Sequence, residues 1–332
     1  MMSNAAPADG DSPFNPNSSQ ILKALESDIQ LDHGDRPLVQ GDHARIWRHT
    51  SLEGVELLQG SYRNYQFARH FHRVPAIGVV DRGSMSSYCR REHHILGTGT
   101  VLLLNPGEVH APAPAGSLGW SFRMFYLEER LFESVTSNVS MQNLRFQQPF
   151  VQDGKLAASL FQLHLELEEN GDRLCFESLL LSIFSRLTER YAEGVSPSTQ
   201  PKSDRIAIDK ARQYLEANYH RNLSLTELAN LSSFSASHFL RMFRDIVGLT
   251  PHAYLTQLRI EFAASLLRIG TPLVEVANLA GFVDQSHFTK KFKRILGITP
   301  GQYILASKSS RQRARVRSRR QRIAEQRNNP QA

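Results

Sequence analysis

The stretch ELANLSSF, residues 227–234, returns as EVANLAGF at residues 275–282. The next stretch, SASHFLRMFRDIVGLTP at residues 235–251, returns as DQSHFTKKFKRILGITP at residues 284–300. The offset between the copies grows by one residue because Val283 is inserted in the second copy. Two copies are too few for a solenoid, so the repeat indicates a duplicated supersecondary unit.

Each copy has the pattern of a short helix, a tight turn and a longer helix. Ser224 precedes Glu227 by three residues, the spacing of a capping box that begins a helix. Ser235 and Asp284 are suited to cap the two longer helices, and Gly248 is suited to end the first of them. At about 100° per residue, each longer helix gathers apolar side chains on one face. These are Phe239, Phe243 and Ile246 in the first copy, and Phe288, Phe292 and Ile295 in the second.

The opposite faces of the two longer helices combine cations with short polar side chains. A helix that lies in the major groove of DNA needs such a face, because its side chains must reach base edges and phosphates. The solvated face of an all-α bundle has a similar composition. Two copies with matching caps and turns favour DNA contact over that alternative.

The repeat resembles the DNA-binding domain of AraC/XylS-type bacterial transcription regulators. The resemblance covers about residues 205–304, and its most specific part is GFVDQSHFTKKFKRILGITPGQY from Gly281. It implies an all-α domain with two helix-turn-helix units joined by a long helix, which we expect at residues 251–269. Each longer helix would then bind one major-groove segment on a single face of the DNA.

The resemblance also implies which side chains contact DNA. Base edges would be contacted by Ser237, Leu240 and Arg241 in the first helix, and by Gln285, Ser286, Thr289 and Lys290 in the second. Phosphates would be contacted by Arg244, Lys293 and Arg294, which position the protein without specifying sequence.

Charge is distributed unevenly along the 332 residues. Residues 1–203 hold 18 Lys and Arg against 23 Asp and Glu, whereas residues 304–332 hold 9 against 1. An acidic front and a basic end suit a protein that touches DNA with its C-terminal part. Only two cysteines are present, Cys89 and Cys175, and the chain shows neither a secretory signal nor an apolar run long enough to span a bilayer. We therefore expect a cytoplasmic protein that does not contact a membrane.

The front half has the texture of an antiparallel β domain. Short runs rich in aromatic and β-branched residues, such as ARIWRH from Ala44 and YQFARHFH from Tyr65, alternate with Gly and Pro breaks. Such runs indicate a sandwich or barrel. The HFH run, the PGEVH turn ending at His110 and their spacing resemble the cupin barrel that senses small molecules in many AraC-type proteins.

Three histidines are candidates for a binding site in this barrel. His70 and His72 alternate along a predicted strand, so their side chains would share a face with each other. Three alternatives remain open: hydrogen-bonded histidines at the barrel mouth, a ligand pocket without metal, and a metal site with Glu108 as a substitute carboxylate. We predict no metal and no cofactor, because no acidic residue follows His72 before Asp81. The predicted ligand-binding residues are His70, His72, His110, Trp120 and Arg123.

Residues 151–193 have the leucine spacing of two amphipathic helices. These helices could pack against the barrel or form a homodimer interface, and both alternatives stay open. The sequence thus divides into a flexible arm (1–38), a cupin-like domain (39–150), this helical hairpin (151–193), a linker (194–203), the DNA-binding domain (204–304) and a basic disordered tail (305–332).

These features predict a DNA-binding transcription regulator rather than an enzyme. Its partners would be promoter DNA, a small-molecule effector in the cupin-like domain and RNA polymerase. Two alternatives compete with this prediction: a metal-dependent cupin enzyme fused to a DNA-binding segment, and a regulator whose cupin-like domain only dimerises.

Overall fold

The computed structural model describes residues 41–48, 54–131, 144–169, 173–194, 203–221 and 223–306. The predicted arm lies outside these ranges, as do most of the linker and nearly all of the basic tail. The predictions for those segments therefore stay predictions.

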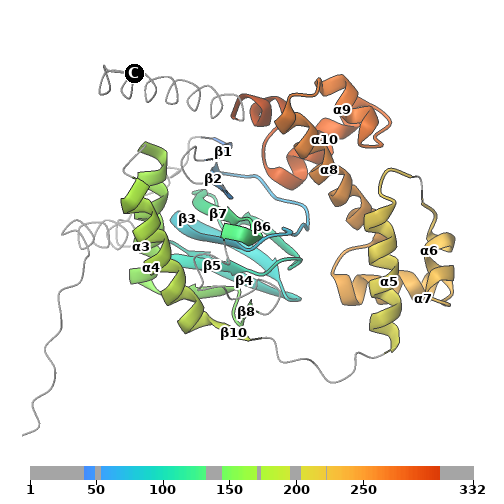
Figure 1. Ribbon diagram of the computed structural model, residues 1–332, viewed down its shortest axis with the longest axis horizontal. Helices are drawn as coiled ribbons and strands as arrows, with labels where there is room; N and C mark the ends of the chain where they lie inside the picture. The colour runs from blue at the N-terminus through green and yellow to red at the C-terminus, as the bar shows by residue number, and fades with distance from the viewer. Residues whose placement is uncertain are drawn as a thin grey trace, which may run out of the picture.

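The N-terminal part is a bent antiparallel sheet that forms an open barrel (Figure 1). Its order is β1-β2-β7-β3-β5-β9, and the long strand β3 pairs along its second half with β4 and β6. Among the described strands β1 and β9 end this path, so the barrel is not closed. A separate pair joins β8 to β10. The strands are β1 (His43–Arg48), β2 (Val55–Tyr62), β3 (Ala76–Cys89), β4 (Glu92–Gly97), β5 (Thr100–Leu104), β6 (His110–Pro114), β7 (Trp120–Leu127), β8 (Leu144–Phe146), β9 (Phe150–Gln152) and β10 (Ala192–Gly194).

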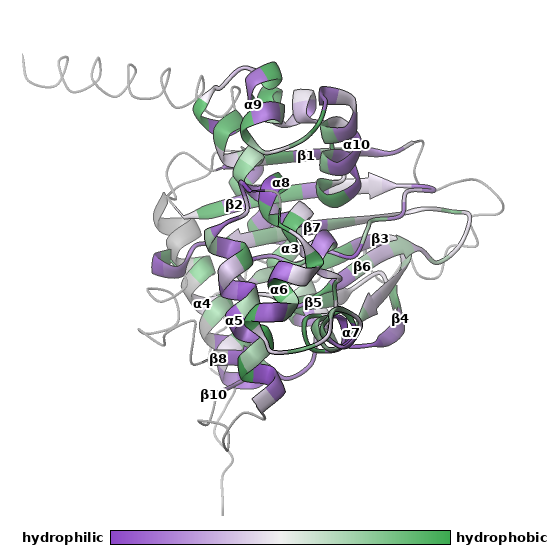
Figure 2. Cartoon of the chain, turned by 90° about the vertical axis from the view of Figure 1, so that its right-hand side faces the viewer, coloured by the Kyte–Doolittle hydropathy of each residue, from purple (hydrophilic) through white to green (hydrophobic). Residues whose placement is uncertain are grey.

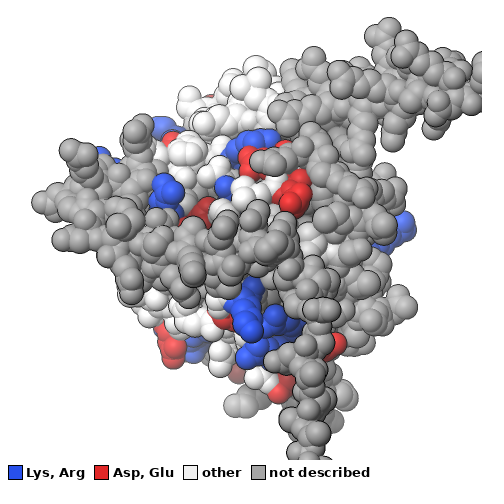
Figure 3. Space-filling view, turned by 90° about the vertical axis from the view of Figure 1, so that its left-hand side faces the viewer, with Lys and Arg blue, Asp and Glu red and all other residues white. Residues whose placement is uncertain are grey.

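The two faces of this sheet pack against different partners. Its outer face is covered by α3 (Gly154–Glu169) and α4 (Arg173–Tyr191), which lie on the side opposite the C-terminal helices (Figure 1). The α3 leucines at 156, 160, 163 and 167 are all buried in one cluster with the outer side chains of β2, β3, β5 and β7. The leucine stripe of α3 therefore packs within the chain. On that side of the molecule, the described surface shows both positive and negative side chains (Figure 3).

The C-terminal part consists of helices with the predicted duplication. They are α5 (Ser203–Ala217), α6 (Leu225–Leu231), α7 (Ala236–Val247), α8 (Pro251–Ile269), α9 (Leu273–Leu279) and α10 (Gln285–Leu296). The side chains of Ser224, Ser235 and Asp284 accept hydrogen bonds from backbone N–H groups and cap α6, α7 and α10, as predicted. Helix α8 has the predicted bounds. At 1.5 Å per residue its 19 residues span about 28 Å between the two helix-turn-helix units.

Both helix-turn-helix units share a hydrophobic core with the barrel. One cluster joins inner barrel residues such as Trp120 and Phe122 to Phe288 and Phe292 of α10. A second cluster joins Phe71 and Val109 to residues of α5 through α8. Seen from the side of these helices, α8 passes in front of the strands (Figure 2). The C-terminal helical domain is thus packed directly on the barrel.

Residues 65–72 differ from the predicted strand. They are irregular apart from a single antiparallel bridge between His70 and His110. The backbone N–H of Phe67 bonds to Pro112, and that of Ala68 bonds to the carbonyl of Arg294 at the end of α10. This segment has no regular ladder because part of its hydrogen bonding goes to the other domain.

Candidate ligand cavity and nucleic-acid interface

A cavity of about 360 Å³ lies between the barrel and the C-terminal helical domain. Its barrel walls are mostly apolar and aromatic. Its remaining wall comes from α8, from the end of α10 and from Tyr303. The barrel supplies Ile46, Leu58, Phe67, Met85, Leu102, Trp120, Phe122, Met124, Tyr126 and Phe150, and α8 supplies Gln257, Glu261, Ala264 and Arg268. A cavity of this size, mostly apolar with a few polar groups, has the character of a small-molecule site.

Four of the five predicted ligand-binding residues line this cavity: His70, His72, His110 and Trp120. Arg123 is not among its lining residues. Alternate side chains of a strand point to opposite faces, so Trp120, Phe122 and Met124 of β7 face the cavity while Arg123 faces α3. The prediction placed Trp120 and Arg123 in one pocket, and the alternation of β7 separates them.

Arg123 instead ties the outer face of the barrel to α3. Its Nε donates to Asp81 at 3.0 Å, and its Nη1 donates to Glu168 at 3.2 Å and to Nδ1 of His164 at 3.0 Å. His164 is fully buried, and its ring packs edge-on against Trp47 and Phe125. Burial, together with the charge of Arg123, lowers the pKa of His164 to about 3.

The three histidines of the cavity form one cluster. The ring centroids of His70 and His110 are 4.3 Å apart. The ring centroid of His72 lies 5.1 Å from that of His70 and 5.0 Å from that of His110. Nδ1 of His70 bonds to the carbonyl of Ala68 at 2.9 Å, and Nδ1 of His110 bonds to the carbonyl of Glu108 at 3.0 Å. Burial lowers the pKa of His70 to about 3 and that of His110 to about 4, and it lowers the pKa of His72 as well. All three imidazoles are therefore neutral near pH 7.

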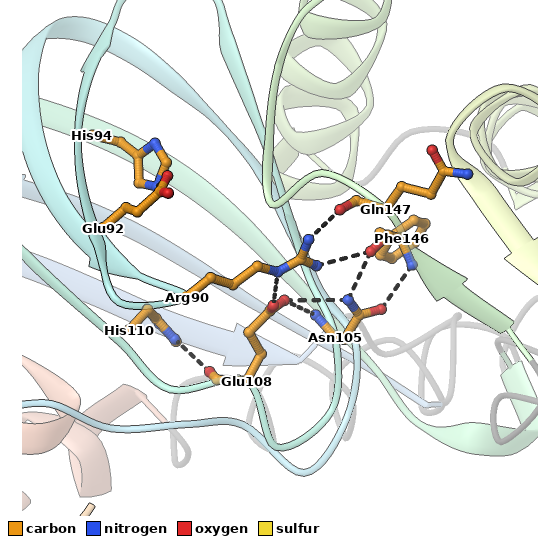
Figure 4. Close-up of polar contacts among 8 residues, drawn as sticks. All are labelled: Arg90, Glu92, His94, Asn105, Glu108, His110, Phe146 and Gln147. Carbon is orange, nitrogen blue, oxygen red and sulfur yellow. Dashed lines mark hydrogen bonds and ion pairs between the residues drawn. The ribbon is translucent and has the colours of Figure 1, made fainter. Parts of the chain in front are cut away.

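The carboxylate of Glu108 points toward Arg90 and Asn105, whereas its backbone carbonyl faces His110 (Figure 4). It accepts hydrogen bonds from Nε of Arg90 and from the backbone and side-chain amides of Asn105. Arg90 and Asn105 also bond to the backbone of Phe146. Glu108 thus positions His110 through its carbonyl group, and its carboxylate serves a different network.

Two buried polar atoms at the cavity have no hydrogen-bond partner among the described residues. They are Nε1 of Trp120 and Oε1 of Gln257. Both side chains are almost completely buried, at 0% and 3% exposure. Such atoms are normally paired, so they mark positions where a ligand can accept from Trp120 and donate to Gln257.

Helix α8 was not predicted to contribute to a binding site. Gln257 donates to the carbonyl of Phe71 at 3.1 Å and to Glu261 at 3.0 Å, and Arg73 donates to Glu261 at 2.7 Å. The sequence signal was present, because the polar residues Gln257 and Glu261 lie one turn apart in a helix whose buried positions are otherwise mostly apolar; Gln257 is buried and Glu261 is half-buried. Only the packing of the two domains shows what that polar pair faces.

The predicted DNA-contacting residues lie on the outer sides of α7 and α10. Thr289 is half-buried and the others are exposed: Ser237, Leu240, Arg241, Arg244, Gln285, Ser286, Lys290, Lys293 and Arg294. The buried faces carry Phe239 and Phe243 in α7, and Phe288, Phe292 and Ile295 in α10. The first turns of both helices therefore present polar side chains to solvent, as direct contact with base edges requires.

The C-terminal ends of α7 and α10 contact the barrel. The hydroxyl of Tyr65 donates to the carbonyl of Lys293 at 2.5 Å, and Arg91 donates to the carbonyl of Asp245 at 2.5 Å. The capping glycines Gly248 and Gly297 have positive φ angles of 83° and 77°. A Cβ on Gly248 would lie 3.2 Å from Val109, and one on Gly297 would lie 2.8 Å from Phe67. Both helix-turn-helix units are thus seated on the barrel through the ends of their second helices.

Two family models match the chain. An AraC-like ligand binding domain matches residues 54–184, and a helix-turn-helix domain matches residues 228–305. Among the described residues, no helix combines the length and apolar character needed to cross a membrane.

Several known proteins are similar to the chain. An uncharacterized HTH-type transcriptional regulator YbfI of Bacillus subtilis is 31% identical over 224 residues, which cover 67% of this chain and 81% of the relative. A probable transcriptional regulator LumQ of Photobacterium leiognathi is 30% identical over 139 residues, covering 41% of this chain and 54% of that protein. The crystal structure of ToxT from Vibrio cholerae aligns with a TM-score of 0.48 at 12% identity, covering 80% of this chain and 98% of that one. The chain therefore belongs to the AraC-type family of DNA-binding transcription regulators, with an N-terminal ligand-binding domain and a C-terminal helix-turn-helix domain.

Proposed function

We propose that a small molecule in the interdomain cavity controls how this regulator engages promoter DNA. The observation that carries the proposal is the composition of the cavity wall. Barrel residues form one side, and residues of α8 and α10 form the other. A ligand in contact with both domains has a different interaction free energy in the docked and undocked arrangements, which is the requirement for shifting between them.

The contacts around the cavity give this control a structural route. Gln257 bonds to Phe71, Arg73 to Glu261, and Arg268 to Glu56 at 3.4 Å, so α8 is joined to the barrel along its length. Because α8 also connects the two helix-turn-helix units, a shift of α8 relative to the barrel changes the positions of α7 and α10 on the barrel.

We propose that the exposed faces of α7 and α10 contact the DNA. Base edges are contacted by Ser237, Leu240, Arg241, Gln285, Ser286, Thr289 and Lys290, and phosphates by Arg244, Lys293 and Arg294.

Filling the cavity from the barrel side tests the proposal without altering the DNA-binding domain. Met85 is buried on β3 and lines the cavity, whereas Ile95 of the neighbouring strand β4 is 70% exposed. Met85→Trp is expected to change affinity for a promoter fragment by at least about fivefold, the lower range of allosteric coupling. Ile95→Trp adds a similar ring outside the cavity and serves as the control. The promoter fragment comes from genome-wide mapping of bound DNA, and the affinity from fluorescence anisotropy.

The same variants report on occupancy of the cavity. The fluorescent anion 8-anilinonaphthalene-1-sulfonate is expected to bind the wild-type chain and the Ile95→Trp chain, and to bind the Met85→Trp chain weakly. Unchanged DNA affinity in a folded Met85→Trp chain that no longer binds the dye would contradict control through the cavity.

The relatives named above are transcription regulators, which favours this proposal over a cupin enzyme. Contact with RNA polymerase and homodimer formation through the α3 and α4 hairpin stay predictions. Sedimentation of the full chain over a range of concentrations tests the dimer.

A further inference from the structure

The sequence predicted no metal, but from the geometry of the cluster we propose that His70, His72 and His110 bind a divalent transition-metal ion inside the interdomain cavity. Each residue offers one ring nitrogen, and the three nitrogens lie within 4.8 Å of one another. Two of the histidines belong to one irregular segment. The third is fixed beside them by the backbone bridge between His70 and His110, with N···O distances of 3.0 Å and 2.9 Å.

The hydrogen bonds made by the rings of His70 and His110 determine which nitrogen of each ring can bind a metal ion. A backbone carbonyl only accepts hydrogen bonds, so Nδ1 of His70 and Nδ1 of His110 must each carry the proton that bonds to Ala68 and to Glu108. Nε2 of both rings therefore keeps its lone pair. A histidine whose second ring nitrogen donates to a backbone carbonyl is oriented in the manner typical of metal ligands.

No hydrogen bond among the described residues accounts for the approach of the three ring nitrogens to within 4.8 Å of one another. Within the described part of the chain the ring of His72 makes no hydrogen bond. Its ring centroid lies 4.7 Å from that of Tyr126. Unprotonated ring nitrogens this close together repel unless a proton donor or a cation lies between them. A metal ion satisfies all three nitrogens together, which a single hydrogen-bond donor does not.

The chemistry of the ligand set narrows the class of ion. Neutral imidazoles suit Zn²⁺, Ni²⁺, Cu²⁺ and Fe²⁺, whereas Mg²⁺ and Ca²⁺ require oxygen ligands. The nearest carboxylate along the chain, that of Glu108, is engaged by Arg90 and Asn105, so the protein ligands are three imidazoles. Three protein ligands leave a position for a further ligand from the cavity.

Occupancy of this site is coupled by short connections to the DNA-binding domain. The carbonyl of Ala68 holds His70, and the N–H of the same residue bonds to Arg294 of α10 at 3.0 Å. Phe71 lies between His70 and His72 and accepts the hydrogen bond from Gln257 of α8. An ion that orders residues 68–72 therefore orders two bonds between the domains. This last step rests on the proposed function, whereas metal binding itself does not.

Metal titration of the full chain tests the site. After removal of metal with a chelator and cleavage of any affinity tag, Zn²⁺ is titrated in competition with a chromophoric chelator, and Co²⁺ binding is followed by its visible absorption. The wild-type chain is expected to bind one equivalent of either ion at the cluster.

His72→Gln is the most informative variant, because it removes a ligand without breaking a hydrogen bond between described residues. Its metal affinity is expected to fall at least about tenfold. His93→Gln, at an exposed histidine on β4, is the matched control.

A second readout separates disruption of the site from disruption of the fold. Without metal, His72→Gln and the wild-type chain are expected to unfold at the same temperature. Zn²⁺ is expected to raise the unfolding temperature of the wild-type chain and of His93→Gln, but not that of His72→Gln. Absence of stoichiometric binding, or equal binding by His72→Gln, would overturn the metal site. If the metal binds but leaves promoter affinity unchanged, the site stands and its coupling to DNA binding is refuted.

Discussion

Gly297, the residue that ends α10, lies against Tyr62, whose hydroxyl donates to the Gly297 carbonyl at 3.4 Å. The two residues belong to different domains and are separated by 235 positions. The close approach depends on glycine for two reasons, since the backbone has a φ of 77° and a Cβ would collide with Phe67 and Tyr62. This contact seats the second helix-turn-helix unit on the barrel.

Gly297→Ala is expected to weaken the contact between the domains. Placing alanine in the left-handed conformation costs about 1–2 kcal/mol of stability by itself. Gly270→Ala measures that cost alone, because Gly270 ends α8 with a φ of 98° and has open space around its Cβ position. Hydrogen exchange should then show faster exchange of the Ala68 amide in Gly297→Ala than in Gly270→Ala. Equal exchange in the two variants would mean that Gly297 acts only as a helix cap.

The buried histidine under α3 makes stability depend on pH. The folded-state pKa of His164 is about 3, below the unfolded value of about 6.5, so the unfolded state takes up a proton first as the pH falls. His164 therefore contributes no penalty above about pH 6.5 and a growing one between about pH 6.5 and 3. At pH 5 the penalty amounts to about 2 kcal/mol.

His164→Asn should remove this penalty and keep an acceptor for Arg123, whose Nη1 lies 3.0 Å from Nδ1 of His164. The free energy of unfolding, measured in urea at several pH values, is expected to fall less steeply below pH 6.5 in the variant. At pH 8 both side chains are uncharged, and the difference between the proteins there gives the packing cost alone. Parallel pH curves for the two proteins would refute the assignment.

The features that the sequence predicted well are those set by near neighbours in the chain. Caps such as Ser235 and Asp284 depend on side chains three residues apart, and α8 has the predicted bounds because Thr250-Pro251 and Gly270 delimit it locally. The placement of Arg123 failed for a different reason. The predicted pocket residues were chosen by chemistry without the strand register, and the register sends Trp120 and Arg123 to opposite faces.

The contribution of α8 to the cavity depends on contacts between distant segments. Gln257 and Phe71 are separated by 186 positions, and no local pattern around either residue indicates that they meet. The histidine cluster could be predicted from the sequence only in part. The spacing of His70 and His72 pointed to one site, but the backbone bridge that brings His110 beside them could not be predicted from their spacing.

The basic tail predicts a non-specific contribution to DNA affinity. Residues 304–332 hold 9 Lys and Arg against 1 acidic residue. Deleting residues 307–332 is expected to reduce the salt dependence of affinity by about 0.9 for each phosphate that the tail neutralises, because fewer counterions are released. The order of preference among promoter variants should stay the same. A loss of discrimination between a specific site and random DNA would assign the tail a role in sequence recognition.

The two recognition helices predict a division between sequence recognition and phosphate anchoring. Arg241 is exposed on α7, where its guanidinium lies 3.0 Å from Nδ1 of His238. Lys293 is exposed in the last turn of α10, next to the ring of Tyr65. Arg241→Ala is expected to cost about 1–3 kcal/mol on the specific site and to relax the base preference at one half-site. Lys293→Ala is expected to weaken binding to all sequences about equally and to lower the salt slope by about 1.

Anisotropy titrations of both variants against matched and mutated sites, at several salt concentrations, measure these effects. A uniform loss of affinity in both variants would contradict the division between sequence recognition and phosphate anchoring. The assignment of DNA binding itself would stand.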